Sequence, residues 1–336
     1  MAVQSETLIV EARLERWPYA SPFRISGYEW SEAELVYVEI ERGGLRGRGE
    51  CAGVYYHEND SPADCLAQIE NMRETLASGA GRLDLLQIMP AGGARNAIDC
   101  ALWDLEAKEQ QRPVWQLAGL EKPQPVRTTY TIGADDPAVM AKGAIAFSDA
   151  TALKLKLTGT GEDEARVRAV RDARPDVWLA VDANQGFTRA FLEQIMPALV
   201  EAQVSLIEQP VAIGREADLE GLHSPIPLAA DESAQTLEDL PPLVDRFHIV
   251  NIKLDKCGGL TAGLAMARRA RQLGLGVMVG NMMGTSIAMA PAFLIGQLCD
   301  VTDLDGPLLL RSDRKPSVEY RHGNLSCGED VWGGAK

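Results

Sequence analysis

The sequence predicts an α/β protein in which a parallel (β/α) barrel follows a smaller α+β domain. Short apolar runs recur along residues 127–305 and alternate with helical patterns. Five of these runs end on a charged residue, at intervals of 26, 26, 23 and 22 residues. That spacing fits a strand, a loop, a helix and a return, repeated around a closed barrel. An open doubly wound sheet is the alternative, but residues 159–161 are too short a glycine-rich segment for its phosphate loop.

The first 122 residues predict the α+β domain. Alternating apolar and polar residues predict antiparallel strands, and an apolar stripe at helical spacing predicts helices after them. Prolines and glycines predict the loops between these elements, and Pro123 and Pro125 mark the linker to the barrel. The predicted strands lie at 7–15, 35–42 and 45–51, the loops at 16–30 and 52–62, and the helices at 63–77 and 91–110.

Residues 123–315 predict the barrel domain, which begins with a strand at Arg127. Helices are expected between the strands, for example over 162–172 and 262–272. The helical pattern stops after Asp305, and residues 318–325 predict a strand and a turn. We therefore expect that the last helix is missing and that residues 316–336 return to the first domain. The predicted barrel strands are 127–133, 152–157, 177–182, 203–208, 226–231, 248–253, 275–280 and 300–305.

Composition argues against two classes of partner. The chain has 336 residues, of which 46% are apolar, and a net charge of −15. The negative charge argues against nucleic acid or an anionic membrane. No apolar run is long enough to span a bilayer, and the first residues do not resemble a signal peptide. The six cysteines fit neither a disulfide framework nor a zinc site, so we expect a cytoplasmic protein. The sequence leaves both a monomer and a homo-oligomer open.

The charged strand ends predict a metal site between two bases. Because the carboxyl ends of parallel strands meet at the barrel mouth, all five side chains are expected to converge there. A Lys-x-Lys pair alone is usually a solvated strand edge, but five charges in register would be costly to bury without a function. Three carboxylates without Cys or His suit Mg²⁺ or Mn²⁺. The five residues are Lys156, Asp182, Glu208, Asp231 and Lys253.

This arrangement suggests proton transfer at a carbon next to a carboxylate. Lys156 and Lys253 fall on the second and sixth of eight strands, half a circle apart. A hard cation that chelates a carboxylate stabilises the charge formed when the adjacent C–H loses its proton. One base on each face then allows racemisation or epimerisation. Lys154 shares a strand face with Lys156, whereas Lys256 is expected to be a solvated lysine at a helix entry.

The segments that carry these charges resemble the enolase superfamily, in its muconate-lactonizing subgroup. The resemblance covers essentially the whole chain. It implies a modified (β/α)7β TIM barrel with an α+β capping domain whose loops close the site. It also implies that Lys156 and Lys253 are the acid/base residues and that Lys154 contacts the substrate carboxylate. The matching segments are Lys154-Leu155-Lys156, Asp182-Ala183-Asn184, Ile207-Glu208-Gln209-Pro210, Ala230-Asp231-Glu232-Ser233 and Asn251-Ile252-Lys253.

Within the subgroup, the chain resembles the dipeptide epimerases that act on L-Ala-D/L-Glu. Asp303-Leu304-Asp305 is similar to their Asp-x-Asp motif, which implies that Asp303 and Asp305 receive the dipeptide ammonium. Arg24 resembles a loop arginine that takes the glutamate side-chain carboxylate, and Thr129 is expected to add a substrate contact. Residues 53–57 depart from the common pattern. The expected setting is the reuse of cell-wall peptide.

Three other functions compete with dipeptide epimerisation. A racemase of N-acyl amino acids, such as N-acyl-glutamate, would need the same five residues at the barrel mouth. Cycloisomerase or o-succinylbenzoate synthase chemistry does not call for Asp303 and Asp305 together. A non-catalytic binding barrel would typically have lost a base or a metal ligand, and all five residues are present here.

Overall fold

A three-stranded antiparallel sheet opens the computed structural model, which describes residues 7–25 and 28–336. The strands β1 (Ile9–Ile25), β2 (Tyr28–Arg42) and β3 (Leu45–Cys51) lie side by side in sequence order. The predicted loop over 16–30 was wrong, because its described residues belong to β1 and β2. The prolines are accommodated because β1 is an edge strand, where a missing N–H is tolerated, and the pairing shifts register between Pro18 and Phe23.

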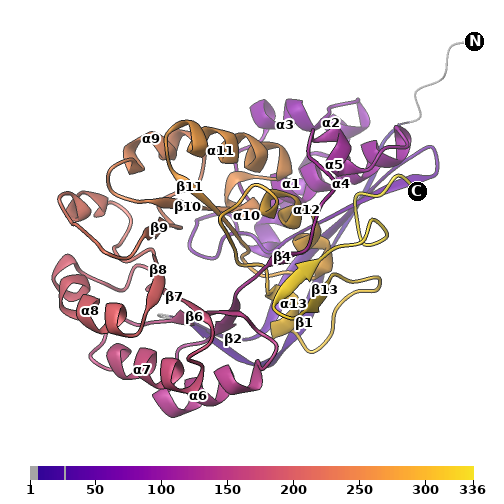
Figure 1. Cartoon of the computed structure of the whole chain (residues 1–336). Coiled ribbons are helices and arrows are strands. Elements are labelled where there is room, and N and C mark those ends of the chain that lie inside the picture. The colour runs from indigo at the N-terminus through magenta and orange to yellow at the C-terminus, as the bar shows by residue number, and fades with distance from the viewer. Residues whose placement is uncertain (1–6, 26–27) are drawn as a thin grey trace, which may run out of the picture.

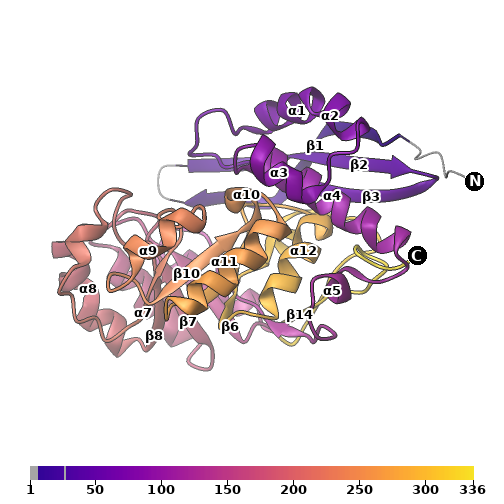
Figure 2. The same ribbon diagram turned by 90° about the horizontal axis from the view of Figure 1, so that it is seen from above.

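Helices cover one face of this sheet and complete the capping domain, as Figure 2 shows. The predicted helix over 63–77 is divided at Met72, and the predicted helix over 91–110 is α4. A Cβ atom on Gly47 or Gly49 of β3 would lie 2.0 Å from a carbonyl oxygen of α4. Glycine therefore lets the helix pack directly on the strand. The helices are α1 (Pro62–Asn71), α2 (Arg73–Ala77), α3 (Arg82–Ile88), α4 (Gly93–Glu109) and α5 (Val114–Leu117).

Eight parallel strands curl into the barrel, in sequence order around the sheet (Figure 1). This confirms the predicted fold class. The backbone N–H of Thr129 donates to the carbonyl of Thr302 at 3.0 Å, which joins the two ends of the sheet. The strands are β5 (Tyr130–Ile132), β6 (Ala152–Lys156), β7 (Trp178–Asp182), β8 (Val204–Glu208), β9 (Leu228–Ala230), β10 (Ile249–Lys253), β11 (Gly276–Gly280) and β12 (Val301–Thr302).

Helices surround the barrel, and its interior is filled by side chains. Ala180, Leu206, Ala229 and Met278, on β7, β8, β9 and β11, form one buried cluster inside the barrel. The predicted helices over 162–172 and 262–272 correspond to α7 and α11. The helices are α6 (Pro137–Ala146), α7 (Asp163–Ala173), α8 (Arg189–Glu201), η1 (Glu216–Leu219), η2 (Leu237–Asp239), α9 (Leu240–Leu243), α10 (Leu254–Cys257), α11 (Leu260–Gln272), α12 (Ser286–Gly296) and α13 (Gly306–Leu309).

The C-terminal segment contacts both the barrel and the capping domain. The strands β13 (Glu319–Arg321) and β14 (Asn324–Ser326) form a small antiparallel sheet with β4 (Val126–Arg127). Beyond them, the indole N–H of Trp332 donates to the carbonyl of Arg48 at 2.8 Å. In the part of the chain that the structure describes, every helix is too short or too polar to cross a membrane.

Candidate active site

A cavity of about 550 Å³ lies between the mouth of the barrel and the capping domain. This volume lies within the range usual for small-molecule sites. Lys154, Lys156, Lys253, Asp303 and Asp305 line it from the barrel. The capping domain contributes a mostly aromatic and acidic wall, which includes Phe23, Glu29, Trp30, Tyr55 and His57.

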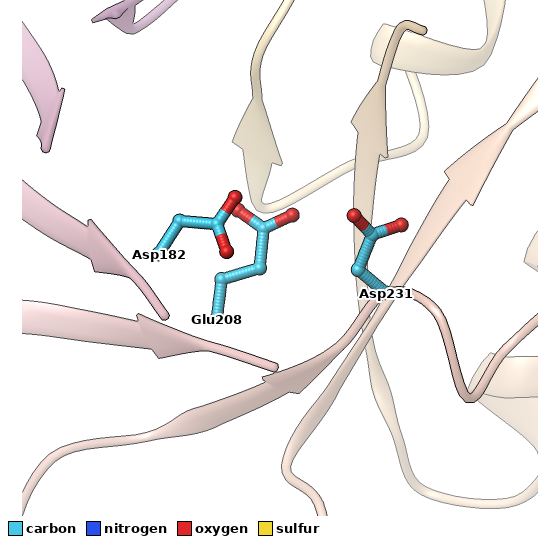
Figure 3. Close-up of side chains that lie close together, drawn as sticks. All are labelled: Asp182, Glu208 and Asp231. Atoms are coloured by element: carbon cyan, nitrogen blue, oxygen red, sulfur yellow. The ribbon is translucent and has the colours of Figure 1, made fainter. Parts of the chain in front are cut away.

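Three carboxylates lie together at the ends of neighbouring barrel strands, beside the lysines that line this cavity. Asp182 and Glu208 end β7 and β8, and Asp231 directly follows β9. All three are buried, and one oxygen of each lies within 4.8 Å of the others. Figure 3 shows the three carboxylates reaching toward a common space from neighbouring strands. The strand register explains why two of these carboxylates lie close together, because Asp182 pairs directly with Glu208 across the sheet.

The charges in this cluster fit a bound divalent cation. Burial raises the pKa of Glu208 to about 8, and the Asp182 carboxylate adds to the shift. The Oε2 atom of Glu208 is buried and accepts no hydrogen bond from the described residues. A bound cation would stabilise the ionised carboxylate of Glu208 and would give its Oε2 atom a partner. Because all three donors are carboxylate oxygens, the residues present fit a hard ion such as Mg²⁺.

The two lysines predicted as bases flank the carboxylates on opposite sides. Lys156 on β6 donates from Nζ to Oδ2 of Asp182 at 2.6 Å, and Lys253 on β10 donates to Oδ2 of Asp231 at 2.7 Å. Both lysines are largely buried, yet they line the cavity. Burial favours the neutral amine of Lys253, but Asp231 and Glu208 outweigh it and raise the pKa of Lys253 above its ordinary value. Each lysine is thus held beside one outer carboxylate of the cluster.

Lys154 joins the carboxylate cluster to Asp303. Its ammonium donates to the Asp303 carboxylate and lies 3.4 Å from Oε2 of Glu208. Thr129 donates from Oγ1 to Oδ1 of Asp303 at 2.5 Å. Burial opposes ionisation of Asp303, but the Lys154 charge prevails and lowers the pKa of that carboxyl. Thr129 therefore lies behind Asp303 rather than along the cavity wall.

Asp305 has a different environment from Asp303. Its Oδ2 atom accepts the backbone N–H of Thr131 at 2.6 Å. Burial and the neighbouring Asp303 carboxylate raise the pKa of Asp305 to about 6. Thr131 also lines the cavity, although the sequence interpretation singled out only Thr129 on this strand. Its position two residues beyond Thr129 is the period of a strand face.

Arg24 lies outside the main cavity. Its guanidinium donates to Glu29 and Asp135, each at 3.0 Å, and its side chain is 44% exposed. It lines a neighbouring cavity of about 330 Å³, which shares Phe23 and Thr131 with the first. The structure therefore places Arg24 beside the main cavity, and its contact with substrate stays a prediction.

The prediction for Lys256 was wrong, because this lysine is buried. Its Nζ donates to Oδ1 of Asp231 at 2.6 Å and to the carbonyl of Asn251 at 3.0 Å. Burial lowers the pKa of Lys256, and the Asp231 charge only partly offsets it. The sequence spacing could have predicted this contact. Lys256 lies three residues after Lys253 on a helical turn, and this spacing brings its side chain back toward the end of the strand.

Two asparagines that were quoted in the motifs without a role support the carboxylates. Asn251 donates from Nδ2 to Oε1 of Glu208 at 2.7 Å, and the backbone N–H of Asn184 donates to Oδ1 of Asp182 at 2.8 Å. Asn251 lies two residues before Lys253, so the strand period could have identified it. Asn184 has a left-handed backbone with φ of 41°, which asparagine tolerates better than most residues.

A capped barrel with three carboxylates between two strand-end lysines is the architecture of a metal-dependent enzyme that moves protons. Residues 138–327 match the family described as Enolase C-terminal domain-like, and residues 6–119 match the Mandelate racemase / muconate lactonizing enzyme, N-terminal domain. The chain therefore belongs to the enolase superfamily, in its mandelate racemase and muconate-lactonizing branch.

Two relatives of known activity are similar to the chain over most of its length. It is 41% identical over 313 residues to the L-Ala-D/L-Glu epimerase of Escherichia coli K12, covering 93% of this chain and 97% of that one. It is 42% identical over 253 residues to the N-acetyl-D-glutamate racemase of a Pseudoalteromonas species, covering 75% of this chain and 80% of that one. With such relatives, this protein is an isomerase of the superfamily.

Two solved structures resemble the fold closely. An enolase family member from Agrobacterium tumefaciens, described with bound sodium and L-Ala-L-Glu, has a TM-score of 0.94 and 42% identity, covering 97% of this chain and 100% of that one. The dipeptide epimerase of Enterococcus faecalis V583, complexed with Mg and L-Leu-L-Tyr, has a TM-score of 0.87 and 29% identity. That comparison covers 96% of this chain and 97% of the other.

Proposed function

We propose that this enzyme epimerises dipeptides of the L-Ala-L/D-Glu type by Mg²⁺-dependent 1,1-proton transfer between two lysines. The observation that carries the proposal is the placement of Lys156 and Lys253 on opposite sides of the three-carboxylate cluster. The similarity to the E. coli epimerase supports the substrate class.

The cofactor in this proposal is Mg²⁺, held by Asp182, Glu208 and Asp231. When bound, it supplies positive charge that holds the substrate carboxylate and stabilises the charge left by the departing α-proton. In the proposal, Lys154 contacts the same carboxylate, and its position between Glu208 and Asp303 supports this role. The burial of the three carboxylates strengthens these interactions.

The two lysines divide the proton transfer between them. One takes the α-proton from one face of the substrate carbon, and the other returns a proton from Nζ to the opposite face. Positioned acids and bases of this kind contribute roughly 10²–10⁴-fold each to the rate. Because β6 and β10 are separated by three strands, the lysines approach from different sides of the mouth.

Asp305 is the stronger candidate for the dipeptide ammonium. Asp303 is already paired with Lys154 and Thr129, whereas Asp305 accepts the backbone N–H of Thr131. Burial and the neighbouring Asp303 carboxylate, which raise the pKa of Asp305, support this choice. A bound ammonium would stabilise the ionised carboxylate of Asp305, and an acyl methyl group would not.

Racemisation of N-acetyl-glutamate is the second candidate. The 42% identity to the Pseudoalteromonas racemase favours it, and so does the Asp303–Lys154 pair, which needs no substrate ammonium. Both functions use the same metal ligands and lysines. Their substrates differ only in the acyl group on the amide nitrogen, which is alanyl in one and acetyl in the other.

Steady-state kinetics with L-Ala-L-Glu and N-acetyl-L-Glu separates the two candidates. We expect kcat/KM to favour the dipeptide by at least about tenfold, roughly 1.4 kcal/mol. Asp305→Asn should reduce the difference in kcat/KM between the two substrates more than Asp303→Asn does, because the charge of Asp303 is already paired with Lys154. A wild-type enzyme that prefers N-acetyl-L-Glu would refute the dipeptide proposal.

We place this activity in the cytoplasm, in the reuse of cell-wall peptide. All six cysteines are free thiols, which agrees with a reducing compartment. A non-catalytic binding barrel is the hypothesis from another class. Mg²⁺-dependent exchange of the substrate α-proton with deuterated water would exclude it.

A further inference from the structure

The short helix α10 directly follows β10, which ends at Lys253. The charged side chains of residues 253–256 contact different parts of the protein. Lys253 lines the cavity, and Lys256 holds Asp231. Asp255 points instead to the capping domain and is only 5% exposed. The proposed chemistry uses Lys253 and the metal ligands but leaves Asp255 without a role.

Asp255 binds the beginning of a capping-domain loop that we call the roof loop, residues 52–60. Its Oδ1 atom accepts the backbone N–H of Ala52 at 2.9 Å and that of Gly53 at 3.2 Å. The chain is tightly folded here: Gly53 has φ of +69°, and a Cβ atom on it would lie 2.0 Å from the carbonyl oxygen of Asp60. Two adjacent N–H groups on one buried oxygen fix the direction in which the loop leaves β3.

The roof loop forms the cavity wall that faces the barrel mouth. Tyr55 and His57 line the cavity beside Trp30 of β2. The Tyr55 ring packs edge-on against Trp30, with ring centres 5.4 Å apart. The Tyr56 hydroxyl accepts a hydrogen bond from Nε2 of Gln235 at 3.1 Å, which ties the tip of the loop to the barrel.

We propose that Asp255 is a positioning residue that fixes the roof loop above Lys253 and thereby sets the affinity for the parts of the substrate beyond its reacting carbon. The inference rests on the proposed function in one respect, namely that the reacting carbon is held at the barrel mouth. In that function, the metal bound by the three carboxylates and the two lysines would hold it there. The rest of the substrate must therefore project toward the wall that the roof loop and β2 provide.

Asp99 offers a matched control for this proposal. It is buried like Asp255 and also bridges the two domains, since it accepts the backbone N–H of Thr261 at 2.9 Å and the Thr261 hydroxyl at 2.6 Å. However, Asp99 joins α4 to α11 and makes no contact with the roof loop in the described hydrogen-bond network. A general loss of domain packing should affect both positions alike, whereas a loss of loop positioning should affect Asp255 alone.

The test compares Asp255→Ala, Asp255→Asn and Asp99→Ala in the full-length, Mg²⁺-loaded enzyme. Amide hydrogen–deuterium exchange read by mass spectrometry reports the roof loop without any need for activity. We expect Asp255→Ala to accelerate exchange in residues 52–57 at least about tenfold, because the Ala52 and Gly53 N–H groups lose their acceptor. Asp255→Asn keeps an acceptor oxygen and should retain the wild-type exchange rate, and Asp99→Ala should leave this segment unchanged.

Kinetics with L-Ala-L-Glu supplies the second readout. Asp255→Ala should raise KM at least about tenfold and change kcat less than about threefold, since the reacting groups keep their places. Unchanged exchange in residues 52–57, or an equal rise of KM in Asp99→Ala, would overturn the proposal. A wild-type enzyme that fails to turn over dipeptides would refute the proposed function instead, and the exchange measurement would then decide the role of Asp255 by itself.

Discussion

The barrel mouth and the capping domain contribute to the site in different ways. At the mouth, the strand ladder fixes the functional groups, because Lys156 pairs in register with Asp182 and Asp182 with Glu208. In the capping domain, the candidate groups lie on a hairpin and a loop, and Arg24 is exposed and bound to surface carboxylates. The difference indicates that the proposed reaction uses groups fixed by the sheet, whereas the proposed substrate selection relies on contacts between the two domains.

Loss of the metal site should have the largest effect. Glu208→Gln removes the central ligand charge, so we expect activity to fall by a factor of about 10³ or more. The fold should persist, because the substitution also removes a buried carboxylate whose pKa is raised to about 8. Activity assays and urea unfolding check both statements. Full activity in the presence of a strong chelator would show that no metal takes part.

The second largest effect is expected when Asp231 loses its buried partner Lys256, and it should appear as a loss of stability. Lys256→Met leaves one Asp231 oxygen and the Asn251 carbonyl without their cation, which should lower the free energy of unfolding by about 3–5 kcal/mol. Lys142→Met, on the exposed face of α6, is the control and should change it by less than about 0.5 kcal/mol. Equal effects in urea unfolding would mean that Lys256 contributes no more than a surface lysine.

Arg24 should show the smallest effect, confined to one class of substrate. Its ion pairs with Glu29 and Asp135 are exposed, and such pairs contribute only about 0–1 kcal/mol, so a substrate carboxylate can replace them. Arg24→Met should raise KM for L-Ala-L-Glu roughly tenfold and leave L-Ala-L-Ala nearly unchanged. If KM rises equally for both substrates, Arg24 serves to join the hairpin to Asp135 and does not bind the substrate side chain. Asp135→Asn should then raise KM in the same way.

The same contrast explains what could be predicted from the sequence. The eight barrel strands and the three buried carboxylates follow from local patterns, since a strand end is marked by the residues that form it. The strand period also placed Lys154 and Lys156 on one face.

The capping domain was harder to predict because its contacts join distant parts of the chain. The prolines of residues 16–30 suggested a loop, and only the position of β1 at the sheet edge makes them compatible with a strand. The bond between Ala52 and Asp255 spans 203 residues and has no local signal. Similarly, Lys256 resembles a solvated lysine until Asp231 is placed beside it.

The exchange of the substrate α-proton in deuterated water tests the two-base account most directly. Lys156→Ala and Lys253→Ala should each abolish epimerisation of L-Ala-Glu, because each loses the group on one face of the carbon. Each variant should still exchange the α-proton of one stereoisomer, and the two variants should choose opposite stereoisomers. If either variant exchanges neither isomer, or if both exchange the same one, the two lysines do not serve opposite faces and the account is contradicted.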